Sequence, residues 1–446
     1  MIKILSSSPD FYFNELNYKT IKDNGYIDIE ISNEIYQECL GFGGAITDSV
    51  AYNFSLMNEK LKDEFINRVF SKDGLNYSLI RLPIGSCDFS TKTYDYLEDN
   101  SFSLSHDEKM FFPILNRIKK IRNFELFASP WSPPSIYKTN RIRQNGGKLK
   151  DNCYNDYALY LLTYLLKMKE AGFNIDYMSL QNEPAATQIW DSCIYEPHEE
   201  ARLLNCLYSL INDNDLNTKI FIWDHNRDII VNRVKDTITN DNYNKIFGIA
   251  YHWYDNDCHS ELSKIHNLYK DKYLLFTEGC IELLLLDNTN PSSSIGRFEN
   301  GLRYAKNYIL DSENFSNGFI DWNILLDETG GPNYVGNVCE SPIMFDKINN
   351  KLLYNPSYYV ISHFSKYIEK GDFRVKTSIL NDFIIATTYK KIDNTYITVI
   401  LNQNGKRKIT YKNNNDVFSF NIENNSITTV IYKESRWDNG YNLWYC

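Results

Sequence analysis

The chain has 446 residues, of which 43% are hydrophobic and 23% are charged, a composition typical of folded globular proteins. Its 57 acidic residues outnumber its 47 basic residues, which gives a net charge of −10. This balance argues against nucleic acid as the main partner, because phosphate binding needs clustered positive charge.

No apolar run approaches the roughly 20 residues that a membrane-spanning helix needs, so we predict no membrane span. The N-terminal stretch becomes polar by Ser8–Asp10, too early for a signal peptide. The nine cysteines are scattered without a Cys-x-x-Cys pair, and the histidines show no metal-ligand spacing. We therefore predict reduced thiols, no metal and a cytoplasmic location.

Along the chain, the first forty residues carry short strand-like patterns, such as the alternation at Tyr26–Ile31. From Gly41, short apolar runs alternate with longer helical stretches, which favours a (β/α)₈ TIM barrel, with an open doubly wound sheet as the alternative. The predicted barrel strands are Phe42–Ala45, Leu79–Pro83, Leu126–Ser129, Met178–Gln181, Ile220–Trp223, Ile249–His252, Tyr273–Thr277 and Phe319–Trp322.

After Lys366 the helical pattern stops, and the remaining sequence reads as strands separated by turns. The N-terminal strands have no other partner, so we expect them to join this all-β part. The sequence thus predicts a barrel over residues 41–366 and a β domain made of 1–40 plus 367–446. The predicted C-terminal strands are Phe383–Tyr389, Tyr396–Leu401, Lys408–Tyr411, Val417–Phe420 and Ile427–Tyr432.

Active sites of such barrels lie at the carboxyl ends of the strands. Carboxylates, amides and aromatic residues gather there, and aromatic residues form 15% of the chain. Indole faces stack on sugar rings, and carboxylates bind sugar hydroxyls. The residues at these ends are Thr47–Asp48, Arg81, Ser86–Asp88, Pro130–Trp131, Asn182–Pro184, Asp224–His225, His252–Tyr254, Glu278 and Trp322–Asn323.

Two carboxylates stand out, because Glu183 and Glu278 each end an apolar strand on opposite sides of the barrel. A pair about 5 to 5.5 Å apart performs retaining glycoside hydrolysis, with one acid protonated and the other ionised. Mutual repulsion in a small site would drive their pKa values apart. The alternative is that each Glu is only a solvated residue at a strand end.

A series of motifs resembles glycoside hydrolase family 30, the glucosylceramidase family, in family order from about residue 41 to 370. The motifs are Gly41–Asp48, Ile80–Ser90, Ala128–Pro134, Lys138–Asn140, Gln181–Pro184, His252–Tyr254, Phe276–Cys280, Asp321–Asn323, Gly330–Asn333 and His363–Lys366. The resemblance implies a barrel with an attached all-β sandwich, retention of configuration, Glu183 as acid/base and Glu278 as nucleophile.

The resemblance also implies which residues bind the sugar. These are Asp48, Trp131, Asn182, Tyr254, Trp322 and Asn337. Asn182 can donate to the sugar 2-hydroxyl, and Tyr254 can hydrogen-bond Glu278 and keep it ionised. Asp48 is either a ligand of two sugar hydroxyls or an N-cap.

Two supporting residues are also predicted from the strand ends. Arg81 either supports Glu278 by its charge or forms only an ion pair inside the barrel mouth, and His252 is expected behind the carboxylates.

We therefore expect an enzyme that removes terminal β-D-glucosyl residues from a β-glucoside or related glycoside, without a cofactor. A β-1,6-glucanase, β-xylosidase or β-fucosidase with the same mechanism, and a non-catalytic carbohydrate-binding barrel, remain alternatives. The family pattern is broken at Ser135–Tyr137 and in the loop after Glu278, where Leu283–Leu286 precede a polar segment. The identity of the aglycone and the oligomeric state stay open.

Overall fold

The computed structural model of the protein describes residues 1–21, 25–98 and 101–434. The chain divides into two compact units. One is continuous and spans Cys39–Lys370, and the other combines Met1–Glu38 with Gly371–Cys446.

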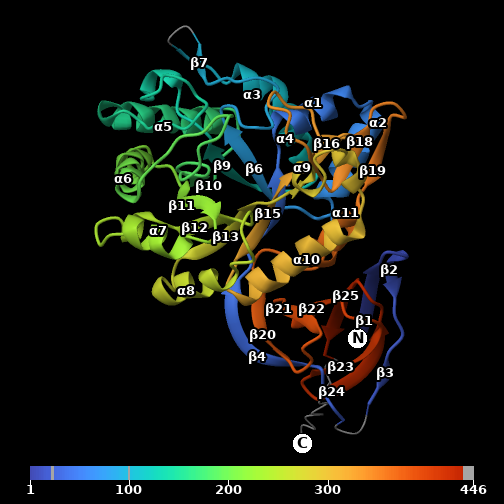
Figure 1. Ribbon diagram of the computed structural model, residues 1–446. Helices are drawn as coiled ribbons and strands as arrows, with labels where there is room; N and C mark the ends of the chain where they lie inside the picture. The colour runs from blue at the N-terminus through green and yellow to red at the C-terminus, as the bar shows by residue number, and fades with distance from the viewer. Residues whose placement is uncertain (22–24, 99–100, 435–446) are drawn as a thin grey trace, which may run out of the picture. The chain divides into compact units, whose positions relative to one another are not determined.

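The continuous unit is a closed barrel of eight parallel strands that follow one another in chain order (Figure 1). Each strand overlaps one of the predicted strands, so the predicted barrel is confirmed. The strands are β5 (Gly41–Ala45), β6 (Leu79–Ile84), β9 (Glu125–Pro130), β10 (Tyr177–Ser179), β11 (Lys219–Asn226), β12 (Gly248–His252), β13 (Tyr273–Glu278) and β15 (Gly318–Asn323).

Helices alternate with these strands, as expected for βα units. They are α1 (Asp48–Leu56), α2 (Glu59–Phe70), α3 (Ser105–Met110), α4 (Phe112–Ile118), α5 (Tyr154–Glu170), α6 (Pro197–Asp213), α7 (Ile230–Thr237), α8 (Ser260–Leu268), α9 (Leu283–Leu286), α10 (Phe298–Glu313) and α11 (Pro356–Ser365). Within the described residues, none of the helices combines the length and the apolar character that crossing a membrane would require.

The loops of the barrel carry short ladders of their own. These are β7 (Leu97–Glu98) with β8 (Ser101–Phe102), β14 (Ile281–Glu282) with β17 (Cys339–Glu340), and β16 (Leu325–Asp327) with β18 (Ile343–Asp346) and β19 (Lys351–Tyr354). The antiparallel pair of β14 and β17 fixes the loop after β13 against the loop after β15.

The interior of the barrel is filled in layers, as in other closed barrels of parallel strands. One apolar cluster comes mainly from the first three positions of the strands: Leu40, Leu79, Phe127, Tyr177, Phe221, Ala250, Leu275 and Ile320. A second cluster lies at the carboxyl ends: Ala45, Cys87, Phe89, Trp131, Cys280, Trp322, Leu326 and Cys339. The second cluster forms the floor of the barrel mouth.

The other unit is a ten-stranded sheet in the order β2-β1-β25-β22-β21-β20-β4-β23-β24-β3. The N-terminal strands pair with the C-terminal ones, as predicted: β1 with β25 and β4 with β20. The strands are β1 (Ile2–Ser8), β2 (Phe11–Glu15), β3 (Lys19–Thr20), β4 (Ile29–Glu38), β20 (Phe373–Ile379), β21 (Ile384–Lys390), β22 (Thr395–Asn402), β23 (Arg407–Asn413), β24 (Asp416–Ile422) and β25 (Ser426–Lys433).

Candidate active site

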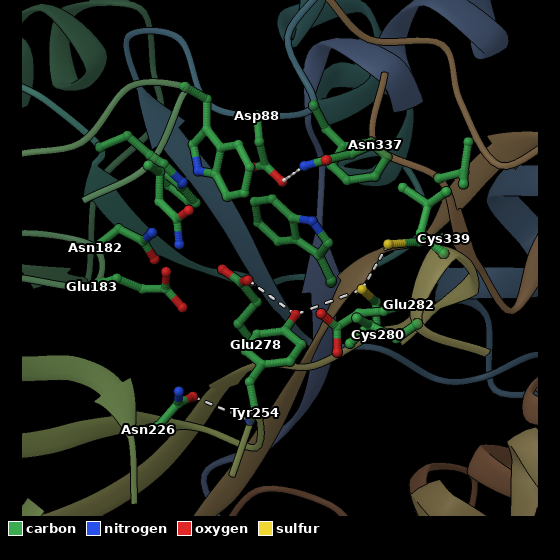
Figure 2. Close-up of a pocket in the computed structure, with 18 of the residues that line it drawn as sticks. Asp88, Asn182, Glu183, Asn226, Tyr254, Glu278, Cys280, Glu282, Asn337 and Cys339 are labelled. Carbon is green, nitrogen blue, oxygen red and sulfur yellow. Dashed lines mark hydrogen bonds between the residues drawn. The ribbon is translucent and has the colours of Figure 1, made fainter. Parts of the chain in front are cut away.

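A cavity of about 330 Å³ opens at the carboxyl ends of the barrel strands. Polar and charged groups on its wall come from several different strands and loops (Figure 2). They include Asp88, Asn182, Glu183, Tyr254, Glu278 and Asn337. The aromatic rings of Trp131 and Trp322 close part of the wall, so the cavity combines hydrogen-bonding groups with flat apolar surfaces.

The two predicted catalytic carboxylates both reach this cavity. Glu278 is the last residue of β13, and Glu183 follows β10 with a φ of 50°. One oxygen of Glu183 lies within 4.8 Å of one oxygen of Glu278. This spacing matches the pair about 5 to 5.5 Å apart that retaining glycosidases use, better than the roughly 6.5 to 9.5 Å of inverting enzymes.

Arg81 holds the carboxylate of Glu278 from inside the barrel. Its guanidinium, with no exposed surface, donates from Nη1 to Glu278 Oε2 at 2.5 Å and from Nη2 to Asn182 Oδ1 at 2.8 Å. The rings of Trp131 and Trp322 lie 4.8 and 5.5 Å from the guanidinium carbon. Both interpretations of Arg81 therefore apply, because it is a buried ion pair that also fixes Glu278.

Asp224 supports the two carboxylates, although its place in the sequence marked it only as a residue at a strand end. Its carboxylate has no exposed surface and accepts from Arg81 Nη2 at 2.9 Å and His252 Nε2 at 3.0 Å. Three hydroxyls also donate to it: Ser129, Ser179 and Thr277. Burial disfavours its charge, but Arg81, His252 and the Ser179 hydroxyl outweigh burial and hold the pKa of Asp224 far below its usual value.

His252 connects Asp224 to Glu183, as expected for a residue behind the carboxylates. Its Nε2 lies 3.0 Å from Asp224 Oδ1 and its Nδ1 lies 3.2 Å from Glu183 Oε1. Burial alone would lower the pKa of His252, but Glu278 and the hydrogen bonds to Asp224 and Glu183 outweigh it and raise the pKa to about 9. In the free protein, His252 therefore carries a proton on each ring nitrogen near neutral pH.

The pKa values of the two catalytic candidates do not follow the expected order. Burial raises the pKa of Glu278, against the opposing charges of His252 and Arg81. Burial also acts on Glu183, but the charges of His225 and His252 outweigh it and lower the pKa of Glu183. The exchangeable proton next to Glu183 thus sits on His252, because that imidazole is flanked by carboxylates on both sides.

We expect the free energy of unfolding to fall as the pH rises from about 6.5 to about 9. The folded pKa of His252 lies above its unfolded value, so its stabilisation is complete below the unfolded pKa and disappears as folded His252 loses its proton. The difference corresponds to about 3 kcal/mol, because one pKa unit is about 1.4 kcal/mol. Urea unfolding across this range should show a shallower pH dependence for His252→Gln, and parallel curves would contradict the assignment.

Tyr254 and Asn182 lie as predicted beside the two carboxylates. The Tyr254 hydroxyl donates to Glu278 Oε1 at 3.1 Å. Because Asn182 Oδ1 accepts from Arg81, its amide nitrogen remains the group that can donate to a sugar hydroxyl. Trp131 and Trp322 stack on each other at a centroid distance of 5.3 Å and are only 2% and 1% exposed, so they form a wall and not projecting platforms.

Asp48, predicted to bind sugar, does not line the cavity. It is the first residue of α1 and is fully buried, with one oxygen 2.9 Å from His106 Nε2 and the other accepting from the Thr91 N–H at 3.3 Å. Asp48 is not the N-cap of α1 either, because the capping side chain is that of Thr47, one residue earlier.

Asp88 takes the place on the wall that had been expected for Asp48. It follows β6, lines the cavity and accepts from Asn337 Nδ2 at 3.2 Å (Figure 2). Sequence reasoning could have selected Asp88, since it also stands just after a predicted strand and inside a motif of the family pattern. Asp88 and Asn337 together present a carboxylate and an amide to one side of the cavity.

Replacing Asp88 with Ala should lower kcat/KM for a glycoside by about tenfold to a hundredfold, since a sugar hydroxyl and the Asn337 amide would lose their partner, at roughly 1 to 3 kcal/mol. Asp48→Asn is the matched control, because Asp48 is buried and does not line the cavity. Asparagine has nearly the same shape as aspartate, so the substitution changes mainly the charge. We expect that control to lower the melting temperature and leave kcat/KM within a few-fold of the parent. The assignment is wrong if Asp48→Asn is the variant that loses activity.

A metal ion is not needed to balance the charges of this site. Glu183, His252 and Glu278 place ligand atoms within 4.8 Å of one another, which is close enough for metal binding. However, both nitrogens of His252 face carboxylates, and Glu278 is bound by Arg81. The described side chains therefore satisfy one another, and the arrangement fits acid and nucleophile roles better than metal ligation.

Comparisons with known proteins show what the chain as a whole is similar to. The family described as glycosyl hydrolase family 30 TIM-barrel domain matches residues 39–368. Putative glucosylceramidase 3 of Caenorhabditis elegans is 30% identical over 93% of this chain and 84% of the relative. The crystal structure of SrfJ from Salmonella typhimurium is 31% identical, with a TM-score of 0.92 over 98% of this chain and 100% of that chain. An endo-β1,6-glucanase structure is 27% identical, with a TM-score of 0.86 over 97% of this chain and 100% of that chain.

Proposed function

The chain belongs to glycosyl hydrolase family 30 and is a glycosidase, and on this premise we propose that it removes terminal β-D-glucosyl residues with retention, through a covalent intermediate on Glu278. The observation that carries the proposal is the pair of carboxylates, Glu183 and Glu278, whose oxygens approach within 4.8 Å in one cavity. A non-catalytic binding barrel is not favoured, since both carboxylates and their supporting groups are in place.

In the first step, Glu278 attacks the anomeric carbon while Glu183 gives a proton to the leaving oxygen. Arg81 and Tyr254 each hold one oxygen of Glu278, which aims the carboxylate and stabilises its charge. Glu183 obtains its proton from Nδ1 of His252, 3.2 Å away. Asp224 makes this transfer possible, because it holds the other ring nitrogen and fixes the imidazole.

In the second step, Glu183 accepts a proton from water, which attacks the anomeric carbon and releases Glu278. The amide nitrogen of Asn182 is positioned to bind the sugar 2-hydroxyl, an interaction that strengthens in the transition state. Asp88 and Asn337 would bind the hydroxyls on the far side of the sugar ring.

The specificity for glucose rests on similarity to relatives named glucosylceramidase. A second candidate is endo-action on β-1,6-glucan, because an endo-β1,6-glucanase resembles nearly the whole chain. Exo- and endo-action make different demands on the leaving-group side of the cavity, to which we assign the lining residues Trp190, Leu284 and Leu285. β-Xylosides and β-fucosides share the mechanism and differ only in hydroxyls of the bound sugar.

The stereochemical outcome tests the mechanism. Proton NMR of an aryl β-glucoside digest should show the β-anomer as the first sugar released, and the α-anomer appearing first would exclude retention. A panel of aryl β-glucoside, β-xyloside, β-fucoside and β-galactoside then ranks the sugars. Digestion of β-1,6-linked oligosaccharides separates the two actions, because exo-action releases only glucose and endo-action releases shorter oligosaccharides.

A further inference from the structure

Two cysteines meet at the wall of the cavity, although the sequence suggested only scattered thiols. The Sγ atoms of Cys280 and Cys339 lie 2.8 Å apart, and each residue is 5% exposed and lines the cavity (Figure 2). Cys280 directly precedes β14, and Cys339 begins β17. The pairing of these two strands brings the sulfurs together across 59 residues of sequence.

We propose that Cys280 and Cys339 are an oxidisable dithiol, a modification site that closes into an intrachain disulfide when it reacts with a small-molecule disulfide such as oxidised glutathione. The two sulfurs are already adjacent and both residues line the cavity, so we expect an oxidant to approach them through the same opening as a substrate. By contrast, Cys87 lies in the same apolar cluster but its sulfur contacts the Ser90 hydroxyl at 3.8 Å.

The reaction consists of two exchanges. The Cys339 thiolate attacks one sulfur of the oxidant, which forms a mixed disulfide and expels a thiolate. The Cys280 thiolate then attacks the sulfur of Cys339 and expels the second thiolate. The two protons lost by the protein appear on the two released thiols, and the two electrons reduce the sulfur–sulfur bond of the oxidant.

The order of attack follows from the surroundings of each thiol. Burial raises the pKa of Cys280 well above its usual value. At Cys339 the hydrogen bond with Cys280 lowers the pKa and burial raises it, which leaves a smaller rise. Cys339 therefore ionises before Cys280, and the exchange should accelerate as the pH rises.

Oxidation would reach the catalytic residues through Tyr254. The Tyr254 hydroxyl lies 3.6 Å from Cys280 Sγ and 3.1 Å from Glu278 Oε1. A disulfide bond is about 2.05 Å long, so closing it draws Cys280 toward Cys339 and moves its sulfur relative to the Tyr254 hydroxyl. We expect kcat/KM to fall on the order of tenfold, because displacements below 1 Å near the reacting groups are costly.

Peptide mapping of the intact protein after treatment with oxidised glutathione tests the site. We expect a disulfide-linked pair of peptides containing Cys280 and Cys339, together with the loss of activity on an aryl β-glucoside and its recovery with dithiothreitol. Cys339→Ala and Cys280→Ala should abolish the cross-link and the response to the oxidant. Cys206→Ala, on α6 outside the cavity, should keep both.

Three results would overturn the proposal: no cross-link in folded protein, the same loss of activity in oxidised Cys339→Ala, or a complete cross-link with unchanged activity. Peptide mapping of the disulfide needs no substrate, so its result tests the dithiol independently of the glycosidase function. If either variant fails to fold, peptide mapping of the oxidised protein without substitutions still shows whether Cys280 and Cys339 form a disulfide.

Discussion

Replacing Glu278 with Gln should reduce turnover of every glycoside by roughly 10⁴-fold or more, because an amide cannot form the covalent glycosyl intermediate. The fold should survive, since Arg81 keeps its ion pair with Asp224 at 2.9 Å after Glu278 loses its charge. Steady-state kinetics with an aryl β-glucoside measures the loss, and circular dichroism measures the melting temperature.

Glu282→Gln is a matched control for this substitution. The Glu282→Gln substitution makes the same chemical change as Glu278→Gln, at another residue that lines the cavity. Among the described residues, Glu282 makes no hydrogen bond with Arg81 or Tyr254, unlike Glu278. We expect its turnover to remain within about tenfold of the parent. A 2-fluoro glycoside inactivator with a good leaving group should label Glu278, and labelling of any other residue would refute the assignment.

Replacing Glu183 with Ala should have an effect that depends on the leaving group. Loss of general acid catalysis costs roughly 10²- to 10⁴-fold, but an activated aryl leaving group departs without a proton. Hydrolysis of an alkyl β-glucoside should therefore fall by about 10³-fold or more, whereas formation of the glycosyl intermediate from a dinitrophenyl glucoside should stay nearly as fast as in the parent.

Pre-steady-state kinetics separates formation of the glycosyl intermediate from its hydrolysis. With the dinitrophenyl substrate, Glu183→Ala should release a burst of phenol and then turn over slowly, because the same residue is needed to activate water. Added azide should accelerate the slow phase and give a β-glucosyl azide. An equal loss of activity with good and poor leaving groups would show that Glu183 is not the acid/base.

The fold was largely predictable because parallel barrel strands are buried on both faces and read as short apolar runs. Leu79–Ile84 is buried at every position, including Arg81. One strand that was not predicted, Phe373–Ile379, mixes charged and apolar residues and begins with Phe373 at 40% exposure, so its pattern lacks a clear buried face. Its place is set by pairing with β4 and β21, which the local sequence does not encode.

The site was only partly predictable, for a related reason. Glu183 and Glu278 stand at strand ends, where the barrel geometry alone brings side chains together. Asp48 and Asp88 also follow strands, but the path of each loop decides which one reaches the cavity. Asp224 is charged inside the barrel because Arg81 and His252 neutralise it and hydroxyls from three other strands donate to it, a pattern distributed over the sequence.

The pairing of the first strand with the last imposes an order on biosynthesis. Ile2 lies opposite Tyr432 and Ser7 opposite Ile427, so β1 has no partner on that side until the ribosome has made residues 427–432. The barrel unit ends at Lys370 and has all its strands earlier. Since domains fold as units during synthesis, we expect the catalytic barrel to fold first. Until β25 is made, the N-terminal strands have an unpaired edge, which a chaperone could protect from aggregation.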